Sequence, residues 1–243
     1  CWLAIALFAG ALVYLSYLTT HEYPAYGAGL YLQIVEQIRA ADYALPSFVP
    51  GYTRGGVPFA YPPLAFYVAA VVFDLTGVSR SSYALYVPGL LVLASIVPYY
   101  FSGKELLGSA RRAGLASLLF ATTPAALQWH LSGGGIVRSM AFLFAISGAY
   151  VGVRLFRSGS RRWLPVAAVL FGLTVLTHPT YTVFFGLTYV LLFAWFDRTL
   201  GGLVTGAVVA AGGFALATPW LVQVVQLHGT DVFTAAAGTH SGL

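Results

Sequence analysis

The chain has 243 residues, of which 59% are hydrophobic and only 8% are charged, and its mean hydropathy is +0.81. A soluble domain usually carries about 25% charged residues, and here the apolar residues form long runs instead of alternating stripes. These features exclude an ordinary soluble enzyme and predict an all-α, polytopic membrane protein. A net charge of +5 would suggest a nucleic acid partner in a soluble protein, but here the basic residues fall in short loops, where they set topology.

The first apolar run, residues 2–18, is about long enough to cross a membrane and lacks a small-residue cleavage site. It therefore predicts a helix and not a signal peptide. The chain begins at Cys1 instead of methionine and ends soon after its last apolar run. We expect a fragment, a single transmembrane domain over residues 1–243 whose C-terminal continuation is missing, with a lipidated Cys1 as the alternative. A single cysteine allows no intrachain disulfide.

A polar loop over residues 19–63 comes next. Residues 27–41 within it are apolar on one helical face and polar on the other, which predicts a helix lying in the membrane interface. Residues 44–58 contain three prolines and three glycines and predict irregular chain. We interpret the loop as external and as one wall of an active site at the membrane surface. It holds three of the seven carboxylates, Glu22, Glu36 and Asp42.

Two prolines follow Tyr61 and begin a short helix predicted over residues 61–75, because proline is tolerated in a first turn. This helix either crosses the membrane or lies beside it as a juxtamembrane or re-entrant segment. Asp74 and Arg80 flank the turn after it and are expected to pair with lipid headgroups. Further membrane helices are predicted at residues 82–102, 113–129, 138–156, 163–177, 181–196 and 202–224.

The distribution of basic residues decides between these topologies. If residues 61–75 do not cross and the N-terminus is cytoplasmic, eight basic residues face the cytoplasm and four face out, as the positive-inside rule requires. If the segment crosses, either the rule is violated or the loop 19–63 is separated from the later polar turns. We therefore favour the non-crossing arrangement. The eight are Lys104, Arg111, Arg112, Arg154, Arg157, Arg161, Arg162 and Arg198, and the four are Arg39, Arg54, Arg80 and Arg138.

The favoured arrangement also places the groups suited to proton or metal chemistry on the outer side. Such a gathering at one membrane face is expected of an outward-facing active site. The groups are Glu22, Glu36, Asp42, Asp231 and the five histidines, His21, His130, His178, His228 and His240.

Glu22 follows His21 directly after the first helix. A carboxylate at the membrane boundary can act as a general base on an acceptor hydroxyl or amine, and it can bind a divalent cation. The alternative is an ordinary solvated pair at the interface. We predict Glu22 and His21 as catalytic candidates, with Glu22 as the ligand if a metal is used; the cofactor itself is left unknown.

Arg138 follows Ser132 and three glycines and opens a predicted helix. Backbone N–H groups at a helix start bind anions and Arg138 adds a fixed charge, so a phosphate or diphosphate headgroup is the expected ligand. His130, on the same turn, is a second candidate donor. The alternative is an arginine whose side chain reaches to the membrane edge.

His178 lies in Thr-His-Pro between two short apolar runs, and only about 34 residues separate Arg162 from Asp197. This turn is expected to lie below the membrane surface, where polar chain must line a cavity or be buried in protein. His178 is therefore either a site residue or the cap of a helix break. His228 and Asp231 either complete the site or mark its rim. No histidine pair has metal-ligand spacing on one helix, and no P-loop, GxGxxG or GxSxG motif supports a soluble-type site.

The passage ADYALP … GYTRGGVPFAYPPLAFY, within residues 41–67, resembles the first external loop of GT-C-type membrane glycosyltransferases. In those enzymes a GDW-x-x-P … G … P-P-L-x-Y pattern runs from the loop into the next helix. They include protein O-mannosyltransferases, aminoarabinose transferases and other relatives of glycosyltransferase family 39. The later order of a long helix, a basic loop, a helix ending at a proline and a polar external turn is similar too, so the resemblance covers about residues 1–180.

The resemblance implies a GT-C-like helix bundle with a long first external loop that carries interfacial helices. In the family a first-loop acidic residue, often in an Asp-Glu pair, is the catalytic or metal-linked group; here the pair reads His21-Glu22, so only Glu22 matches in kind. The family's donors are polyprenyl-phosphate sugars, gripped by basic residues at the outer face, which implies Arg138 and Arg54. The substrate-binding candidates are Arg138, His130, His178, Arg54 and Tyr61.

We therefore expect an enzyme of the cell membrane that transfers a hexosyl or pentosyl group from a polyprenyl-phosphate-linked donor. The acceptor is expected to be a protein, lipid or glycan at the extracytoplasmic face, with membrane lipid and no nucleic acid among the partners. A transporter or lipid flippase without covalent chemistry is the main alternative, although the internal repeats frequent in transporters are not found. A non-catalytic scaffold is a third interpretation, because histidine occupies position 21.

Overall fold

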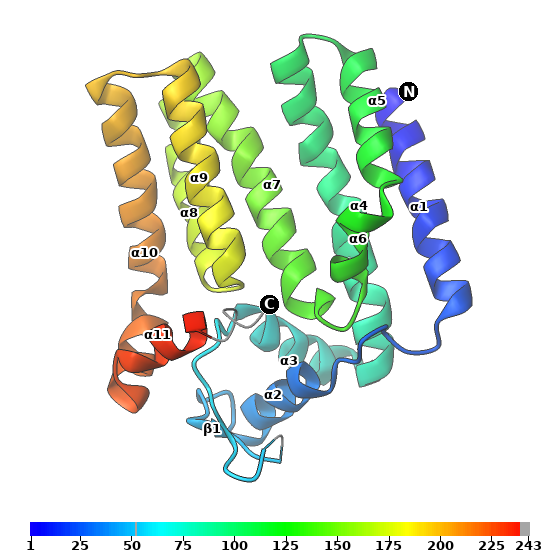
Figure 1. The fold of residues 1–243 in the computed structure, drawn as a ribbon, viewed down its shortest axis with the longest axis vertical. Helices are drawn as coiled ribbons and strands as arrows, with labels where there is room; N and C mark the ends of the chain where they lie inside the picture. Colours follow the sequence, from blue (N-terminus) through cyan, green and yellow to red (C-terminus); the bar gives the residue numbers. More distant parts are fainter. Residues whose placement is uncertain (52, 239–243) are drawn as a thin grey trace.

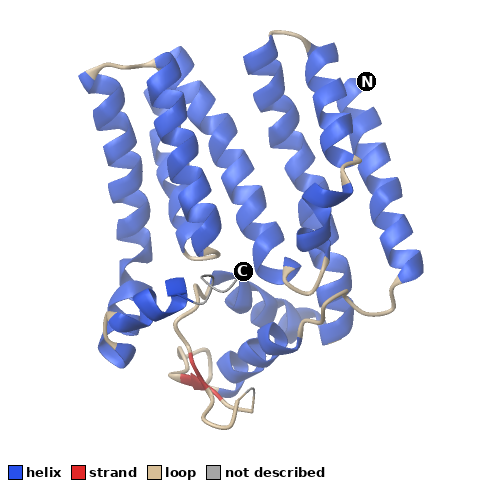
Figure 2. Cartoon of the chain, viewed as in Figure 1, coloured by secondary structure: helices blue, strands red, loops and turns tan. Residues whose placement is uncertain are grey.

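The computed structural model of the protein describes residues 1–51 and 53–238; the side chains of residues 124–126 and 236–238 lie outside this description, as does His240. Most of it is helix (Figure 2). Strands β1 (Phe48–Val49) and β2 (Val57–Pro58) pair antiparallel in the first loop. The α-helices are α1 (Trp2–Thr20), α2 (Gly29–Ala40), α3 (Leu64–Thr76), α4 (Arg80–Leu107), α5 (Ala110–Ala121), α6 (Pro124–Leu131), α7 (Gly135–Ser158), α8 (Leu164–Val175), α9 (Pro179–Phe196), α10 (Leu200–His228) and α11 (Asp231–Gly238), with a 3₁₀ turn, η1, at Arg161–Trp163.

Five described helices, α1, α4, α7, α9 and α10, are long and apolar enough to cross a membrane. The prediction of an all-α, polytopic membrane protein is therefore confirmed. Helices α5 and α6 run beside α4, and α8 runs beside α7 and α10 (Figure 1). Helix α3 has 13 residues and lies with α2 at one end of the bundle, so the segment expected at residues 61–75 packs against that end in the structure.

The single helix predicted over residues 113–129 is wrong, because the structure has α5 and α6 there with a break between them. Pro124 has no N–H to continue the helix, and its ring disfavours helical backbone at Thr123, which is extended at φ −87° and ψ 105°. The hydroxyls of Thr122 and Thr123 donate to the carbonyls of Leu118 and Leu119, which satisfies the last turn of α5. The break changes the direction of the chain shortly before the glycines at the start of α7.

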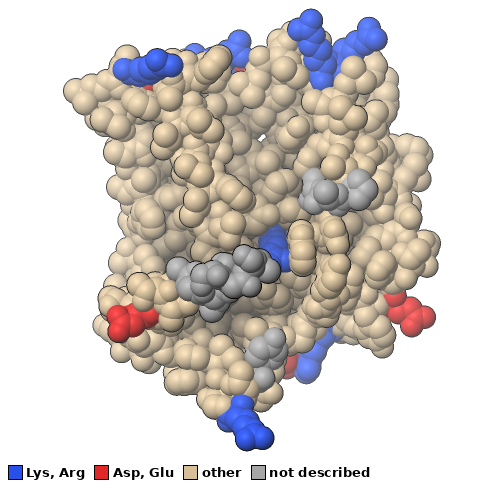
Figure 3. Space-filling view, viewed as in Figure 1, with Lys and Arg blue, Asp and Glu red and all other residues tan. Residues whose placement is uncertain are grey.

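The two ends of the bundle differ in charge. The N-terminus and the α4–α5, α7–α8 and α9–α10 connections lie at one end, which we call the basic end (Figure 1). Lys and Arg side chains gather there in the space-filling view (Figure 3). The eight basic residues assigned to the cytoplasm by sequence all belong to these connections or the adjoining helix ends. We call the other end, which carries α2, α3 and the two strands, the loop end.

Helix α2 buries its apolar face against protein. Ile34, Val35 and Ile38 are buried in one cluster with residues of α3 and of the first turns of α7. These side chains are therefore not available to insert into lipid, which refines the expectation of a helix embedded in the interface. Burying three aliphatic side chains of this size stabilises the docked helix by several kcal/mol, at about 1.5–3 kcal/mol for each.

An ion-pair network fixes α2 against α3 and the start of α4. Arg39 lies 2.6 Å from Asp74 and 2.9 Å from Glu36, and Arg80 lies 3.0 Å from Glu36. Tyr43 also donates its hydroxyl to Asp74. Asp74 and Arg80 were expected to pair with lipid headgroups, and that expectation is wrong, because α2 supplies their partners within the protein.

Glycines let the long helices approach closely, as small residues do at helix interfaces in membranes. A Cβ added at Gly148 of α7 would lie 2.0 Å from Phe185 of α9. A Cβ at Gly172 of α8 would lie 2.9 Å from the carbonyl oxygen of Gly213 on α10. The packing of α7 against α9 and of α8 against α10 therefore depends on these positions.

Candidate functional site

Four of the five predicted substrate-binding residues gather at the loop end of the bundle. His130 is in the last turn of α6, Arg138 is in the first turn of α7, and His178 is the N-cap of α9. Tyr61 comes three residues before α3. The four residues come together because each lies at or near the end of a helix, and these helix ends meet at the loop end of the bundle.

His178 has one ring nitrogen committed to its helix. Its Nδ1 accepts a hydrogen bond of 3.2 Å from the backbone N–H of Thr180. The neutral ring therefore carries its proton on Nε2. The imidazole is 8% exposed and lies between aromatic rings, with centroids 6.0 Å from Tyr61 and 5.3 Å from Tyr181. The two sequence-based interpretations of His178 are thus compatible, because it caps α9 and also lines the cluster.

His130 joins the same aromatic group from the opposite side. Its Nε2 lies 2.5 Å from the hydroxyl of Tyr181, and its ring centroid lies 4.5 Å from that of Phe142. It is buried, with 8% exposure. Tyr181 therefore links His130 and His178, which are far apart in sequence.

The segment that contains Tyr61 is held in place by the turn before His178. The N–H of Leu64 donates to the carbonyl of Leu176 over 2.9 Å, and Thr177 beside it is fully buried. Burial, as the largest effect, and the neighbouring Tyr31 raise the pKa of the Tyr61 hydroxyl far above its ordinary value, while Arg138 opposes the rise. Tyr61 is therefore a neutral hydrogen-bonding group at physiological pH.

Arg138 is the cation of this cluster. It is partly buried, and its charge opposes the rise in the pKa of the Tyr61 hydroxyl. Its guanidinium carbon lies 5.3 Å from the centre of the Trp129 ring. No carboxylate pairs with it among residues 1–51 and 53–238. A half-buried arginine without a protein counter-ion is suited to bind an anionic ligand.

Tyr181, Trp129 and Phe142 belong to the cluster but were missed by sequence reasoning. With 16 tyrosines, 17 phenylalanines and 5 tryptophans in the chain, an aromatic residue near a helix end is also what a membrane-interface belt would produce. The spacing of Tyr181, three residues after His178, was the available signal, because residues three apart share a helix face.

His21, Glu22 and Arg54 do not join the cluster through any described contact. His21 folds back on α1, where its ring stacks on Tyr17 with centroids 4.3 Å apart. Glu22 and Arg54 are exposed and have no ion-pair partner in the part of the chain that the structure describes. The strongest link is indirect: the carbonyl of Ala25 accepts from the N–H of Gly133 over 2.8 Å, which docks the loop that carries Glu22 beside the cluster.

The described residues also do not form a protein-held metal site, because no three His, Cys, Asp or Glu side chains gather among them. Glu22 alone does not provide the several oxygen ligands that a divalent cation takes.

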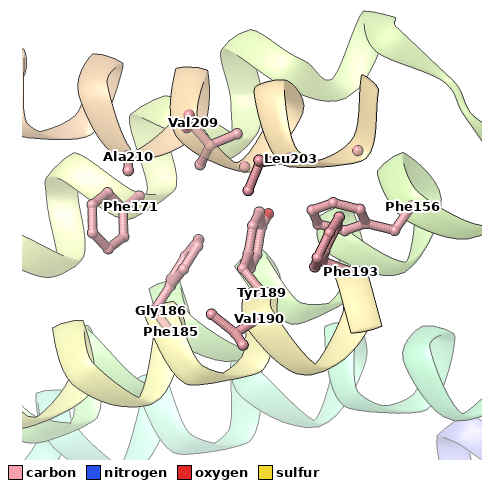
Figure 4. A pocket seen from close by; sticks show the side chains of 13 residues that line it. Phe156, Phe171, Phe185, Gly186, Tyr189, Val190, Phe193, Leu203, Val209 and Ala210 are labelled. Atoms are coloured by element: carbon pink, nitrogen blue, oxygen red, sulfur yellow. The ribbon is translucent and has the colours of Figure 1, made fainter. Parts of the chain in front are cut away.

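An apolar groove lies between α9 and α10 (Figure 4), and none of its lining residues belongs to the polar cluster. It has a volume of about 360 Å³ and is lined by phenylalanines, aliphatic residues and glycines, including Phe185, Tyr189 and Leu203. The Tyr189 hydroxyl donates to the Gly148 carbonyl and is satisfied within the protein. The lining of the groove contains no charged side chain, whereas the cluster at the loop end contains Arg138.

These observations define a class: a multi-pass helical membrane protein with a cationic and aromatic site at one end of its bundle. A family model described as dolichyl-phosphate-mannose-protein mannosyltransferase matches residues 60–223, and the chain belongs to this family of GT-C-type membrane glycosyltransferases. Comparisons with curated proteins and with solved structures gave no match. The resemblance predicted from the first loop is confirmed. The family assignment supports a glycosyltransferase and not the alternative of a transporter or lipid flippase. Tyr61, His130, Arg138 and His178 lie inside the matched segment, whereas His21, Glu22 and Arg54 precede it.

Proposed function

We propose that the cluster around Arg138 binds the phosphate of a polyprenyl-phosphate-linked sugar, and that the sugar passes to an acceptor at the extracytoplasmic face. The observation that carries the proposal is the half-buried guanidinium of Arg138, which has no carboxylate partner among the described residues and whose charge opposes the rise in the pKa of the Tyr61 hydroxyl. The family assignment supplies the class of donor. The proposed acceptor is a protein hydroxyl, as the family description suggests.

The charge change in the reaction fits this site. The acceptor oxygen attacks the anomeric carbon, and the bond from that carbon to the phosphate oxygen breaks. Polyprenyl phosphate leaves with the electron pair and gains one negative charge, which the fixed guanidinium of Arg138 stabilises. The neutral hydroxyl of Tyr61 is suited to donate a hydrogen bond to a phosphate or sugar oxygen, and the ring of His178 lies beside it, with centroids 6.0 Å apart.

Glu22 is the proposed base that takes the acceptor proton. It lies three residues before Ala25, whose carbonyl is bonded to Gly133. At 3.3–3.6 Å per extended residue, the Cα of Glu22 is within about 11 Å of the Cα of Ala25. The exposure of Glu22 suits a group that meets an acceptor arriving from water.

The proposed sidedness rests on the charge of the two bundle ends. The eight basic residues at the basic end favour the cytoplasm, and the cluster lies at the other end. The polyprenyl chain would then remain in the outer leaflet while its phosphate reaches Arg138.

The test is transfer of mannose from a polyprenyl-phosphate mannose to a serine- and threonine-rich peptide by the full-length protein in vesicles. Arg138→Gln should lower kcat by about 10²–10³-fold, the usual effect of removing one group that stabilises a developing oxyanion. Arg138→Lys should retain part of the rate because the charge remains. Arg111→Gln, an equal charge change at an exposed position of the basic end, is the control.

Two results would contradict the assignment. Normal transfer by Arg138→Gln would remove the anion site, and uptake of the donor without sugar transfer would favour a transporter. For the base, Glu22→Gln should abolish transfer while donor binding is retained. A wild-type rate in that variant would remove Glu22 from the mechanism.

A further inference from the structure

Trp129 makes two contacts that join the first loop to Arg138. The guanidinium carbon of Arg138 lies 5.3 Å from the Trp129 ring centre. The Tyr26 ring stacks on the same indole, with centroids 5.3 Å apart and planes at 22°. Tyr26 also accepts a hydrogen bond of 2.9 Å from the side-chain amide of Gln128, the residue before Trp129.

The backbone holds Tyr26 in an unusual conformation to make this stack. Tyr26 has φ +63°, a left-handed conformation that is uncommon for a residue with a side chain. Its neighbours are fixed on both sides: Ala25 accepts from Gly133, and a Cβ at Gly133 would lie 1.5 Å from the carbonyl oxygen of Gly27. The loop is therefore closely docked on the α6–α7 connection where Tyr26 stacks on the indole.

We infer that Trp129 is a positioning residue for Arg138, and that Tyr26 completes this support only when the first loop is docked. The inference rests on the proposed function of Arg138 as the phosphate-binding cation. It adds a link between the loop that carries the candidate base and the group that binds the leaving phosphate. Donor binding and loop docking are then coupled through one indole ring.

The physical need for such support follows from the freedom of the arginine side chain. Arg138 has no ion-pair partner in the described ranges, so no carboxylate fixes its position. A cation–π contact with tryptophan supplies the missing restraint without neutralising the charge, and a contact of this kind changes an equilibrium by about tenfold. An acidic partner would restrain the guanidinium equally well, but it would compete with phosphate.

The competing explanation is that Trp129 only anchors the protein at the membrane interface, where tryptophan is enriched. Trp129 is 52% exposed, as an anchor would be. Trp195 of α9 is 79% exposed and makes no described cation–π contact, so it is a matched tryptophan for comparison.

The experiment measures binding of a polyprenyl monophosphate to the full-length protein in nanodiscs, for Trp129→Leu and Arg138→Gln singly and together. Trp129→Leu should weaken binding about tenfold, and Trp129→Phe, which keeps an aromatic face, should restore most of it. In the Arg138→Gln background the Trp129→Leu change should have no further effect. Tyr26→Leu should weaken phosphate binding less than Trp129→Leu does. Trp195→Leu should bind the phosphate as tightly as the wild type.

The outcomes separate this inference from the proposed function. If Arg138→Gln binds the phosphate normally, the anion site and the inference both fail. If Arg138→Gln weakens binding but Trp129→Leu weakens it equally in both backgrounds, only the positioning role is overturned. An equal loss in Trp195→Leu also overturns it in favour of anchoring. Thermal unfolding of each variant shows whether weaker binding reflects a loss of folding. If Trp129→Leu fails to fold, phosphate binding by Tyr26→Leu, a change at an exposed residue, tests the positioning role instead.

Discussion

At the scale of single residues, His178 has two tasks that one substitution can separate. Its Nδ1 caps α9 through Thr180, and its ring lies beside Tyr61 and Tyr181. Asparagine is also a good N-cap, whereas alanine costs about 1 kcal/mol at such a position. We predict that His178→Asn unfolds near the wild-type temperature and His178→Ala unfolds several degrees lower, while both lose transfer activity.

Thermal unfolding in detergent and the mannose-transfer assay measure the two effects independently. Wild-type activity in His178→Asn would show that the imidazole acts only as a cap. A low unfolding temperature in His178→Asn, equal to that of His178→Ala, would show instead that ring packing outweighs the cap.

Sequence reasoning identified the ionisable members of the cluster because such residues are costly in apolar surroundings. Arg138, His130 and His178 each interrupt or border an apolar run, which made them conspicuous. Tyr181 and Trp129 could not be distinguished from belt aromatics, because their role depends on contacts between helices that are distant in sequence. The place of Glu22 in the chemistry stays a prediction, because it meets none of these residues in a described contact.

At the scale of helices, the contact of α7 with α9 can be tested at one glycine. A methyl group at Gly148 would lie 2.0 Å from the buried ring of Phe185, so Gly148→Ala must displace this ring or separate the helices and should cost about 1–3 kcal/mol, the usual cost of overpacking. Gly186 on α9 has no neighbour within 4 Å of an added Cβ, so Gly186→Ala should be neutral or slightly stabilising. Thermal unfolding in the same lipid compares the two, and an equal effect would argue against close α7–α9 packing.

The docking of α2 on α3 should depend on pH. Hydrogen bonds from Arg39 first, and from Tyr43, lower the pKa of the Asp74 carboxyl below its ordinary value of 3.8. A depressed carboxyl pKa stabilises the folded state above about pH 3.8, and this contribution is lost as the pH falls through the folded value. We predict a steeper loss of unfolding temperature below pH 4 in the wild type than in Asp74→Asn. Parallel curves for the two proteins would show that the network contributes nothing measurable.

The helices themselves were largely predictable, because long apolar runs in a membrane have few alternatives to a helix. The break between α5 and α6 was missed, since Thr122 and Thr123 are compatible with an apolar run and the sequence marks the interruption only by Pro124. The partners of Asp74 and Arg80 were also missed, because they come from α2, which is distant in sequence.

At the scale of the whole molecule, the charge of the two bundle ends predicts the membrane orientation. In a protein with Cys1→Ser, a single cysteine at Thr53→Cys should react with a membrane-impermeant maleimide in intact cells. A cysteine at Arg112→Cys should react only after permeabilisation, because it lies at the basic end. Both positions are exposed, so access and not burial controls labelling. The reverse pattern would place the Arg138 cluster on the cytoplasmic side.

The hydrogen bond from Leu64 to Leu176 has a consequence for biosynthesis. The ribosome releases residues 61–64 long before it makes the α8–α9 turn that receives them, and chains emerge at about 5–20 residues per second. The hydrogen bond from Leu64 to Leu176 and the contact of Tyr61 with His178 therefore cannot form until α4 to α8 have been made. The cluster around Arg138 is consequently completed late in synthesis, so the proposed phosphate site cannot form until α8 and the start of α9 are in place.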